Sequence, residues 1–108
     1  MAPLFHIVRS ADWAAAQQSG EYAPPSLASE GFIHLSAEHQ VAGTLGRFYA
    51  GVPDLCLLVL DESALGSALC WEEGEPGELF PHLYRALTLD EVLEVRPVQE
   101  SWEVPGTS

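Results

Sequence analysis

Leu55-Cys56-Leu57-Leu58-Val59-Leu60 is an unbroken apolar run that follows the turn residues Pro53 and Asp54. A strand with one face in water alternates apolar and polar residues, whereas a strand covered on both faces is apolar throughout. The run therefore predicts a central strand with protein packed against both of its faces. The rest of the chain must supply the neighbouring strands and the covering layers.

Two strands and two helices are expected on the N-terminal side of this run. The expected strands are Leu4–Arg9 and Phe32–Leu35, and the expected helices are Trp13–Gln18 and a segment from Ala37 to about Ala50. Ser10 and Ser36 precede these helices and belong to the residue types that cap helix N-termini, and Gly20 ends the first helix. Four apolar residues of the second helix share one side at helical spacing and are expected in the core: Val41, Leu45, Phe48 and Tyr49.

The segment Glu21–Gly31, EYAPPSLASEG, lies between the first helix and the second strand. It is rich in proline and serine and is expected to be a surface loop. Long loops in small domains tend to carry function, so this segment is expected to have a functional role.

Three further strands are expected on the C-terminal side of the apolar run. They are Leu69–Glu72, a short part of Phe80–Leu87, and Val92–Val98. Between the first two, Glu73–Leu79 is expected to be an acidic loop, and Thr88 with Glu91 has the spacing of a capping box. Helices early in the chain and strands late in it favour an α+β fold over a doubly wound sheet.

The length and charge of the chain narrow its class. Its 108 residues are typical of one domain, which we expect to span residues 1–98 with a flexible tail at 99–108. Sixteen Asp and Glu residues against four Arg and no Lys give a net charge of −12. Because such a surface repels phosphate groups, we expect no binding to nucleic acid or to anionic membranes.

The sequence predicts neither a membrane span nor a secretory signal. No apolar run approaches the roughly 18 residues that a span requires, and MAPLFHIVRS lacks the basic start of a signal peptide. Cys56 and Cys70 lie in apolar runs and form no CxxC pair, so we expect buried, reduced thiols rather than a disulfide or metal pair. Reduced thiols are typical of the cytoplasm, which is the expected location.

Histidines carry the main functional signal. Three of the four fall on expected strands, namely His6 in LFHIV, His34 in GFIHLS and His82 in FPHLY. The fourth, His39, falls in the first turn of the second helix and is expected at the surface. Three separate structural histidines are less expected than one shared site.

The strand pattern puts polar side chains on one side of the sheet. Alternate residues of a strand share a face, so His34 lies with Phe32 and Ser36, and His82 lies with Tyr84. Apolar residues fill the opposite faces of these strands: Ile33, Leu35 and Leu83. Polar side chains gathered on one side of a small sheet suggest the floor of a cleft.

Other interpretations of the same residues stay open. Each histidine alone is compatible with a structural role in which a backbone carbonyl satisfies the ring. Three convergent imidazoles would also suit zinc, but no HxH or HExxH motif presets two ligands, so no metal is expected. Ser36 beside His34 would suit a nucleophile, although no GxSxG motif surrounds it.

Charged residues add two candidates to the site. Glu72 ends the strand ALCWE and is the acidic residue best placed to enter a cleft. Arg9 ends the first strand and is placed to take a phosphate, whereas Arg85 and Arg96 are expected to pair with carboxylates.

Three motifs in combination resemble the bacterial domain-of-unknown-function family 952. They are FHIVRSADWAAAQQSGEY, SLASEGFIHLS and ELFPHLYRALTLDEV, and the resemblance extends to about Pro97. It implies no established activity. It does imply a fold similar to the ADP-ribosyltransferase superfamily, which is a small split β-sheet sandwich, here with two early helices, that holds NAD in a cleft.

The resemblance implies roles for the candidate residues. His6 would bind a ribose, His34 and Ser36 would line the nicotinamide or phosphate region, and Tyr84 would stack on the ligand. His82 stands where ADP-ribosylating enzymes carry a late glutamate. The expected catalytic residues are His34, His82 and Glu72. The expected function is an NAD- or nucleotide-related small-molecule enzyme, with a non-catalytic nucleotide-binding module or a protein-interaction module as alternatives.

Overall fold

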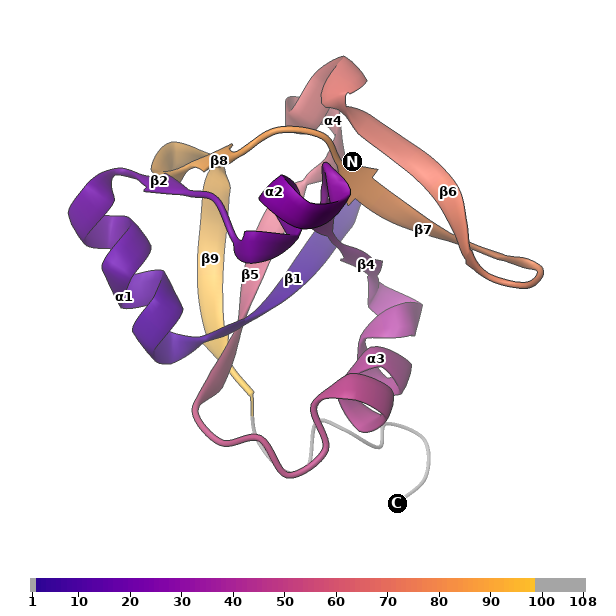
Figure 1. Ribbon diagram of the computed structural model, residues 1–108, viewed down its shortest axis with the longest axis horizontal. Coiled ribbons are helices and arrows are strands. Elements are labelled where there is room, and N and C mark those ends of the chain that lie inside the picture. Colours follow the sequence, from indigo (N-terminus) through magenta and orange to yellow (C-terminus); the bar gives the residue numbers. More distant parts are fainter. Residues whose placement is uncertain (1, 99–108) are drawn as a thin grey trace.

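Strand β5, Leu55–Asp61, lies inside a four-stranded antiparallel sheet of order β4-β1-β5-β9 (Figure 1). The computed structural model describes residues 2–98 of the chain. The partners of β5 are β1, Pro3–Arg9, and β9, Val92–Pro97, and β4, Ser36–Ala37, pairs with β1 on its other edge. All six residues of the apolar run are buried, which confirms the predicted central strand.

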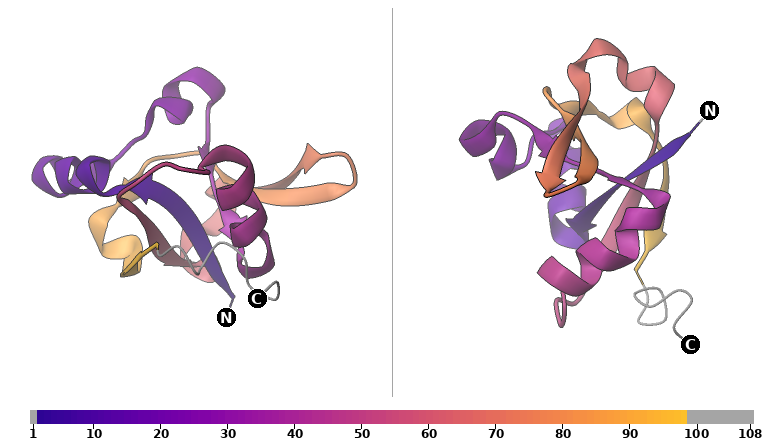
Figure 2. Two further views of the ribbon diagram at one scale, coloured as in Figure 1. Left: turned by 90° about the horizontal axis from the view of Figure 1, so that it is seen from below. Right: turned by 90° about the vertical axis from the view of Figure 1, so that its right-hand side faces the viewer.

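Two smaller antiparallel sheets complete the β-structure of the described residues. One pairs β2, Glu21–Tyr22, with β8, Leu87–Thr88. The other has the order β3-β7-β6 and consists of Ile33–His34, Glu78–Leu83 and Leu69–Glu75, respectively. Strands β6 and β7 form a hairpin that projects from the body of the molecule beside α3 (Figure 2).

Within residues 2–98, four helices and three 3₁₀ turns connect the strands. The helices are α1, Ser10–Ser19; α2, Pro25–Glu30; α3, Val41–Phe48; and α4, Glu62–Leu65. The turns are η1, Glu38–Gln40; η2, Gly66–Ala68; and η3, Leu89–Glu91. The fold is therefore α+β with several antiparallel sheets, and two of its helices, α2 and α4, were not predicted.

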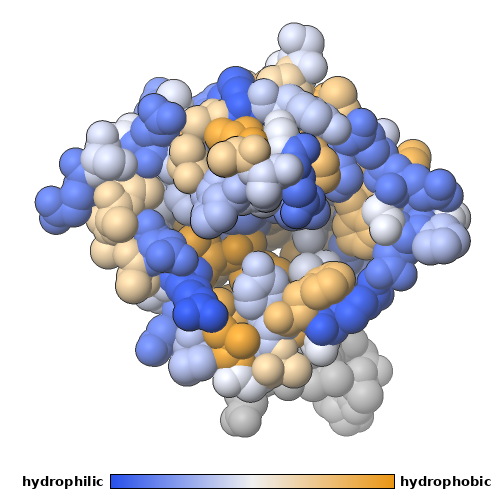
Figure 3. Space-filling model, in the orientation of Figure 1, coloured by the Kyte–Doolittle hydropathy of each residue, from blue (hydrophilic) through white to orange (hydrophobic). Residues whose placement is uncertain are grey.

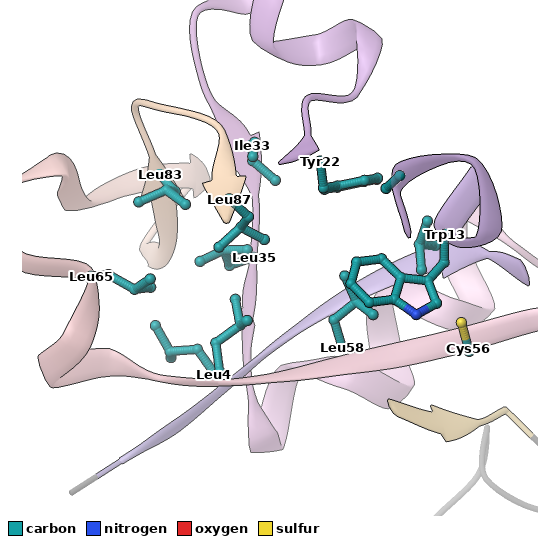
Figure 4. Packing of buried hydrophobic residues seen from close by; sticks show 13 residues of the cluster. Leu4, Trp13, Tyr22, Ile33, Leu35, Cys56, Leu58, Leu65, Leu83 and Leu87 are labelled. Carbon is teal, nitrogen blue, oxygen red and sulfur yellow. The ribbon is translucent and has the colours of Figure 1, made fainter. Parts of the chain in front are cut away.

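The two faces of β5 bury two separate apolar clusters. Cys56, Leu58 and Leu60 enter the larger one, which lies between the four-stranded sheet and the two smaller sheets (Figure 4). Leu55, Leu57 and Val59 enter the second, where α3 supplies two side chains, Val41 and Leu45. One face of the sheet is thus covered by other strands and the opposite face by a helix.

The prediction of a surface loop at Glu21–Gly31 is wrong, because this segment forms β2 and α2. Pro25 stands in the first turn of α2, where its missing N–H costs nothing, and Gly31 follows the last residue of the helix. This proline-start, glycine-stop pattern outweighs the loop-like composition of the segment.

The prediction of an acidic loop at Glu73–Leu79 is also wrong, because β6 and β7 extend through most of this segment. Pro76 and Gly77 form the turn of the hairpin, and Gly77 has a φ of 83°. Proline followed by a residue of positive φ is the signature of a type II turn. The acidic residues therefore lie on a hairpin rather than on a free loop.

The expected helix caps are only partly right. Ser10 is the first residue of α1 and makes no side-chain cap, and Ser36 lies in β4 rather than at a helix start. The side chain of Gln40 instead accepts the Ala37 N–H at 2.9 Å. The capping box of Thr88 and Glu91 is confirmed.

Several side-chain environments differ from expectation or agree with it. Phe48 is 66% exposed instead of buried, because it is the last residue of α3 and lines the open cleft. Both cysteines are free thiols, with Cys56 buried and Cys70 half-buried.

Among residues 2–98, no helix is long and apolar enough to cross a membrane. The expected flexible tail lies outside the described residues.

Candidate functional site

His34 and His82 face each other across neighbouring strands. They are register partners in the β3–β7 pair, and their ring centroids are 5.5 Å apart. The next pair along the ladder is joined by a hydrogen bond from the Leu35 N–H to the Pro81 carbonyl at 3.0 Å. Because hydrogen-bonded and non-hydrogen-bonded pairs alternate, His34 and His82 form a non-hydrogen-bonded pair, the type in which side chains approach most closely.

Each of these imidazoles has its own carboxylate partner. Nε2 of His34 lies 2.9 Å from Oε1 of Glu30, and Nδ1 of His82 lies 2.8 Å from Oε1 of Glu72. A carboxylate accepts hydrogen bonds, so the facing ring nitrogen carries the proton in both pairs. In neutral His82 this leaves Nε2 unprotonated and able to accept a proton.

Glu72 is also held by Tyr84. The Tyr84 hydroxyl donates to the same Oε1 of Glu72 at 2.5 Å. This bond and the one from His82 lower the pKa of Glu72, and the carboxylate raises the pKa of Tyr84 to about 12. Glu72 therefore stays ionised and fixes the tautomer of His82.

Aromatic contacts hold the histidine pair from the side. The Phe32 ring stacks on His82 with a centroid distance of 4.0 Å and an interplanar angle of 16°. The same ring lies 4.8 Å from His34 and 5.3 Å from Tyr84. Phe32 thus contacts the three residues that the strand pattern placed on one face.

His6 does not join the ring cluster, because protein groups occupy both of its nitrogens. Nδ1 lies 2.6 Å from the backbone carbonyl of His34, and Nε2 lies 2.7 Å from the Tyr22 hydroxyl. Burial lowers the pKa of His6 to about 4. The ring is therefore neutral near pH 7 and has no free atom for the ribose contact that the resemblance implied.

A cleft of about 740 Å³ connects these residues. Figure 3 shows it as a hollow near the centre of one face, between α2 and α3. Five predicted site residues line it, namely His6, Arg9, His34, Ser36 and His82. Glu72 and Tyr84 are not among its lining residues. Glu72 instead bonds to Nδ1 of His82, and Tyr84 bonds to Glu72.

One edge of β1 runs along this cleft. The Ser10 N–H donates to the carbonyl of Asp54, the residue before β5, at 2.8 Å. Backbone groups of successive strand residues point alternately toward and away from a neighbouring strand. Because Ile7 is three residues before Ser10, its backbone groups point away from β5. On that side β4 pairs only with Leu4 and Phe5. The N–H and C=O of Ile7 therefore face the cleft and are available to a ligand.

The charges around the cleft are mixed. Four carboxylates and two guanidinium groups line it: Asp12, Glu30, Glu73, Glu75, Arg9 and Arg47. Arg47 pairs with Glu75, and, outside the cleft, Arg85 pairs with Glu91 and Arg96 with Glu94, as expected for the last two. Within residues 2–98, Arg9 has no carboxylate oxygen within 4.0 Å, which leaves its guanidinium group available to an anion.

The described residues contain no cluster of three or more His, Cys, Asp or Glu side chains arranged to hold a metal ion. The two neighbouring imidazoles instead bind separate carboxylates. Ser36 lines the cleft as a buried residue, opposite Phe5 in the β1–β4 pair. His39 is exposed and lies outside the cleft, as expected.

Sequence reasoning missed Glu30 and Tyr22 as site residues and gave Phe32 no role. Sequence alone does not indicate Glu30 because its segment has the composition of a loop, and its four-residue spacing from His34 is informative only with α2 in place. Tyr22 is 16 residues from His6 in sequence, and nothing in the local pattern of either residue indicates their contact.

Comparisons with known proteins give a family and a fold but no activity. A crystal structure of protein CC0527 from Caulobacter crescentus is 35% identical in sequence, with a TM-score of 0.85 over 90% of this chain and 86% of that chain. A solution NMR structure of CC0527 is 34% identical, with a TM-score of 0.80 over 94% and 90%. Among curated proteins, none matches this chain. A family model described as protein of unknown function (DUF952) matches residues 7–95, and the chain belongs to this family.

Proposed function

We propose that the cleft binds a small nucleotide-like molecule, with NAD or an ADP-ribose derivative as the first candidate, and that His34 and His82 transfer protons during its conversion. The observation that carries this proposal is the pair of contacting imidazoles, each held by its own carboxylate, on the wall of a cleft. A histidine held by a carboxylate is a common general acid or base near neutral pH.

The two ends of the cleft suit different parts of such a ligand. Arg9 lies four residues along β1 from Phe5, the partner of Ser36, which corresponds to about 13 Å at the usual rise of a strand. A phosphate at Arg9 would therefore lie at the opposite end from a group beside Ser36. The excess of carboxylates in the cleft favours a ligand that also carries positive charge, as the oxidised nicotinamide ring does.

The chemistry that this arrangement suits best is cleavage of an N-glycosidic bond. The bond between the ribose carbon and the base breaks, its electron pair leaves with the base, and positive charge develops at the ribose carbon. Glu30 lines the cleft and is the carboxylate placed to stabilise that charge, a role predicted for Glu72. Water or an acceptor hydroxyl then adds its oxygen to the ribose carbon and loses its proton to Nε2 of His82.

In this proposal the fold is ADP-ribosyltransferase-like, and the enzyme is a transferase or a glycohydrolase. Support comes from the Gly31–Ser36 motif and from a cleft bordered by separate sheets. The proposal also keeps a small-molecule partner, a cytoplasmic location suited to the free thiols, and no binding to nucleic acid.

The test is NMR of the four histidine side chains with NAD, ADP-ribose and AMP at millimolar concentration. We expect signals of His34 and His82 to shift in a saturable way, while exposed His39 serves as an internal reference that stays fixed. Unchanged signals of His34 and His82 with all three compounds would contradict the proposal.

Mass spectrometry of the same mixtures separates an enzyme from a binding module. Release of the base or of an ADP-ribosyl product, lost in His82→Asn and retained in His39→Asn, supports catalysis. Saturable binding without product would favour the non-catalytic nucleotide-binding alternative.

A further inference from the structure

The backbone carbonyl of His34 needs a donor that its own sheet does not provide. Strand β3 is at the edge of the β3-β7-β6 sheet, with β7 on one side only. His34 and His82 form a non-hydrogen-bonded pair, so the N–H and C=O of His34 point away from β7. A polar backbone group that turns into the protein interior requires a partner.

His6 is that partner. Its Nδ1 lies 2.6 Å from the carbonyl oxygen of His34 and, because a carbonyl only accepts, Nδ1 carries the proton. His6 is 8% exposed, and burial lowers its pKa to about 4, so the ring is neutral and Nε2 has no proton. The Tyr22 hydroxyl, 2.7 Å away, must therefore donate to Nε2. Two partners thus fix one tautomer of His6.

We propose that Tyr22 and His6 are positioning residues that hold the edge strand β3 so that His34 lies against His82. Strand β3 has only two residues, so its ladder to β7 provides few hydrogen bonds of its own. The bond from His6 ties it to β1, the strand next to β5 in the four-stranded sheet. The functional importance of this arrangement rests on the proposed function, whereas the positioning itself is a property of the free protein.

Two substitutions of His6 form a matched pair for the test. The side-chain amide of asparagine places its nitrogen near the position of Nδ1, whereas that of glutamine places it near Nε2. We expect His6→Asn to keep the nuclear Overhauser effect between the side chains of His34 and His82. We expect His6→Gln to lose it. A His6→Gln protein that keeps this contact, or a His6→Asn protein that also loses it, would overturn the proposal.

A measurement on the unmodified protein covers the case in which His6→Gln does not fold. Nitrogen-15 NMR of the imidazole rings at pH 7 reports which nitrogen of His6 carries the proton. We expect the Nδ1–H tautomer, which is the minor form of free histidine. A proton on Nε2, or on both nitrogens, would overturn the assignment. Neither experiment contains a ligand, so failure of the NAD titration leaves the outcome of both experiments unaffected. Failure of either experiment likewise leaves the NAD titration unaffected.

Discussion

In the four-stranded sheet, β5 has every residue from Leu55 to Leu60 buried, whereas in the three-stranded sheet β6 has no fully buried residue and β3 has only Ile33. The first sheet is therefore held by apolar surface on both faces. The second packs one face on the core and is held on the other by specific polar and aromatic contacts among the site residues. The apolar core contacts and the polar contacts of the candidate site are thus divided between two sheets that meet at the cleft.

The strongest test of this division is removal of apolar volume from β5. Leu58 is 0% exposed, and Leu58→Ala is expected to lower the free energy of unfolding by about 2–5 kcal/mol, because it removes buried methyl groups and leaves a cavity. Urea unfolding followed by circular dichroism measures the loss.

A matched leucine in the same sheet provides the control. Leu93 on β9 is 62% exposed, and Leu93→Ala is expected to change the free energy of unfolding by less than about 0.5 kcal/mol. Equal losses in the two variants would show that burial in β5 does not carry the stability of the fold.

The next largest effect is a loss of stability in acid that depends on His6, the residue of β1 that binds β3. Burial lowers the pKa of His6 from 6.5 to about 4. As the pH falls below 6.5, the unfolded chain takes up a proton that the folded protein does not bind. The contribution of neutral His6 to the free energy of unfolding is therefore fully present above pH 6.5. It decreases by up to about 1.4 kcal/mol per pH unit, or about 3 kcal/mol in total, until about pH 4.

His6→Asn isolates this contribution because asparagine does not titrate. Urea unfolding at pH 7.5, 6 and 5 is expected to give a shallower loss of stability for the variant than for wild type. The carboxylates titrate in both proteins and cancel in the difference. Parallel pH profiles would mean that His6 titrates normally in the folded state.

The four-stranded sheet was largely predictable from sequence. An unbroken apolar run specifies central β5, buried on both faces, without reference to any distant residue. The face pattern of Phe32, His34, His82 and Tyr84 was predictable for the same reason, since strand alternation is a local property.

The contacts within the site were not predictable in the same way. Glu30 reaches His34 because α2 forms in a segment whose composition resembles a loop, and Tyr22 reaches His6 through tertiary packing. The role of His6 also depended on its environment. The strand pattern placed it near the site, but only the positions of two partners show that its ring is fully engaged inside the protein.

The smallest expected effect concerns electrostatics within the three-stranded sheet. Tyr84→Phe removes the hydrogen bond that does most to lower the pKa of Glu72, so that pKa is expected to rise toward its ordinary value. Carbon-13 NMR of the glutamate carboxyl groups measures the titration, and Glu94, whose pKa is lowered by Arg96, is an internal reference that should not move. Because Tyr84 is 42% exposed and outside both apolar clusters, the urea midpoint should stay that of wild type. A shifted midpoint with unchanged Glu72 titration would reverse the division between the sheets, since Tyr84 would then support the fold rather than tune the carboxylate behind His82.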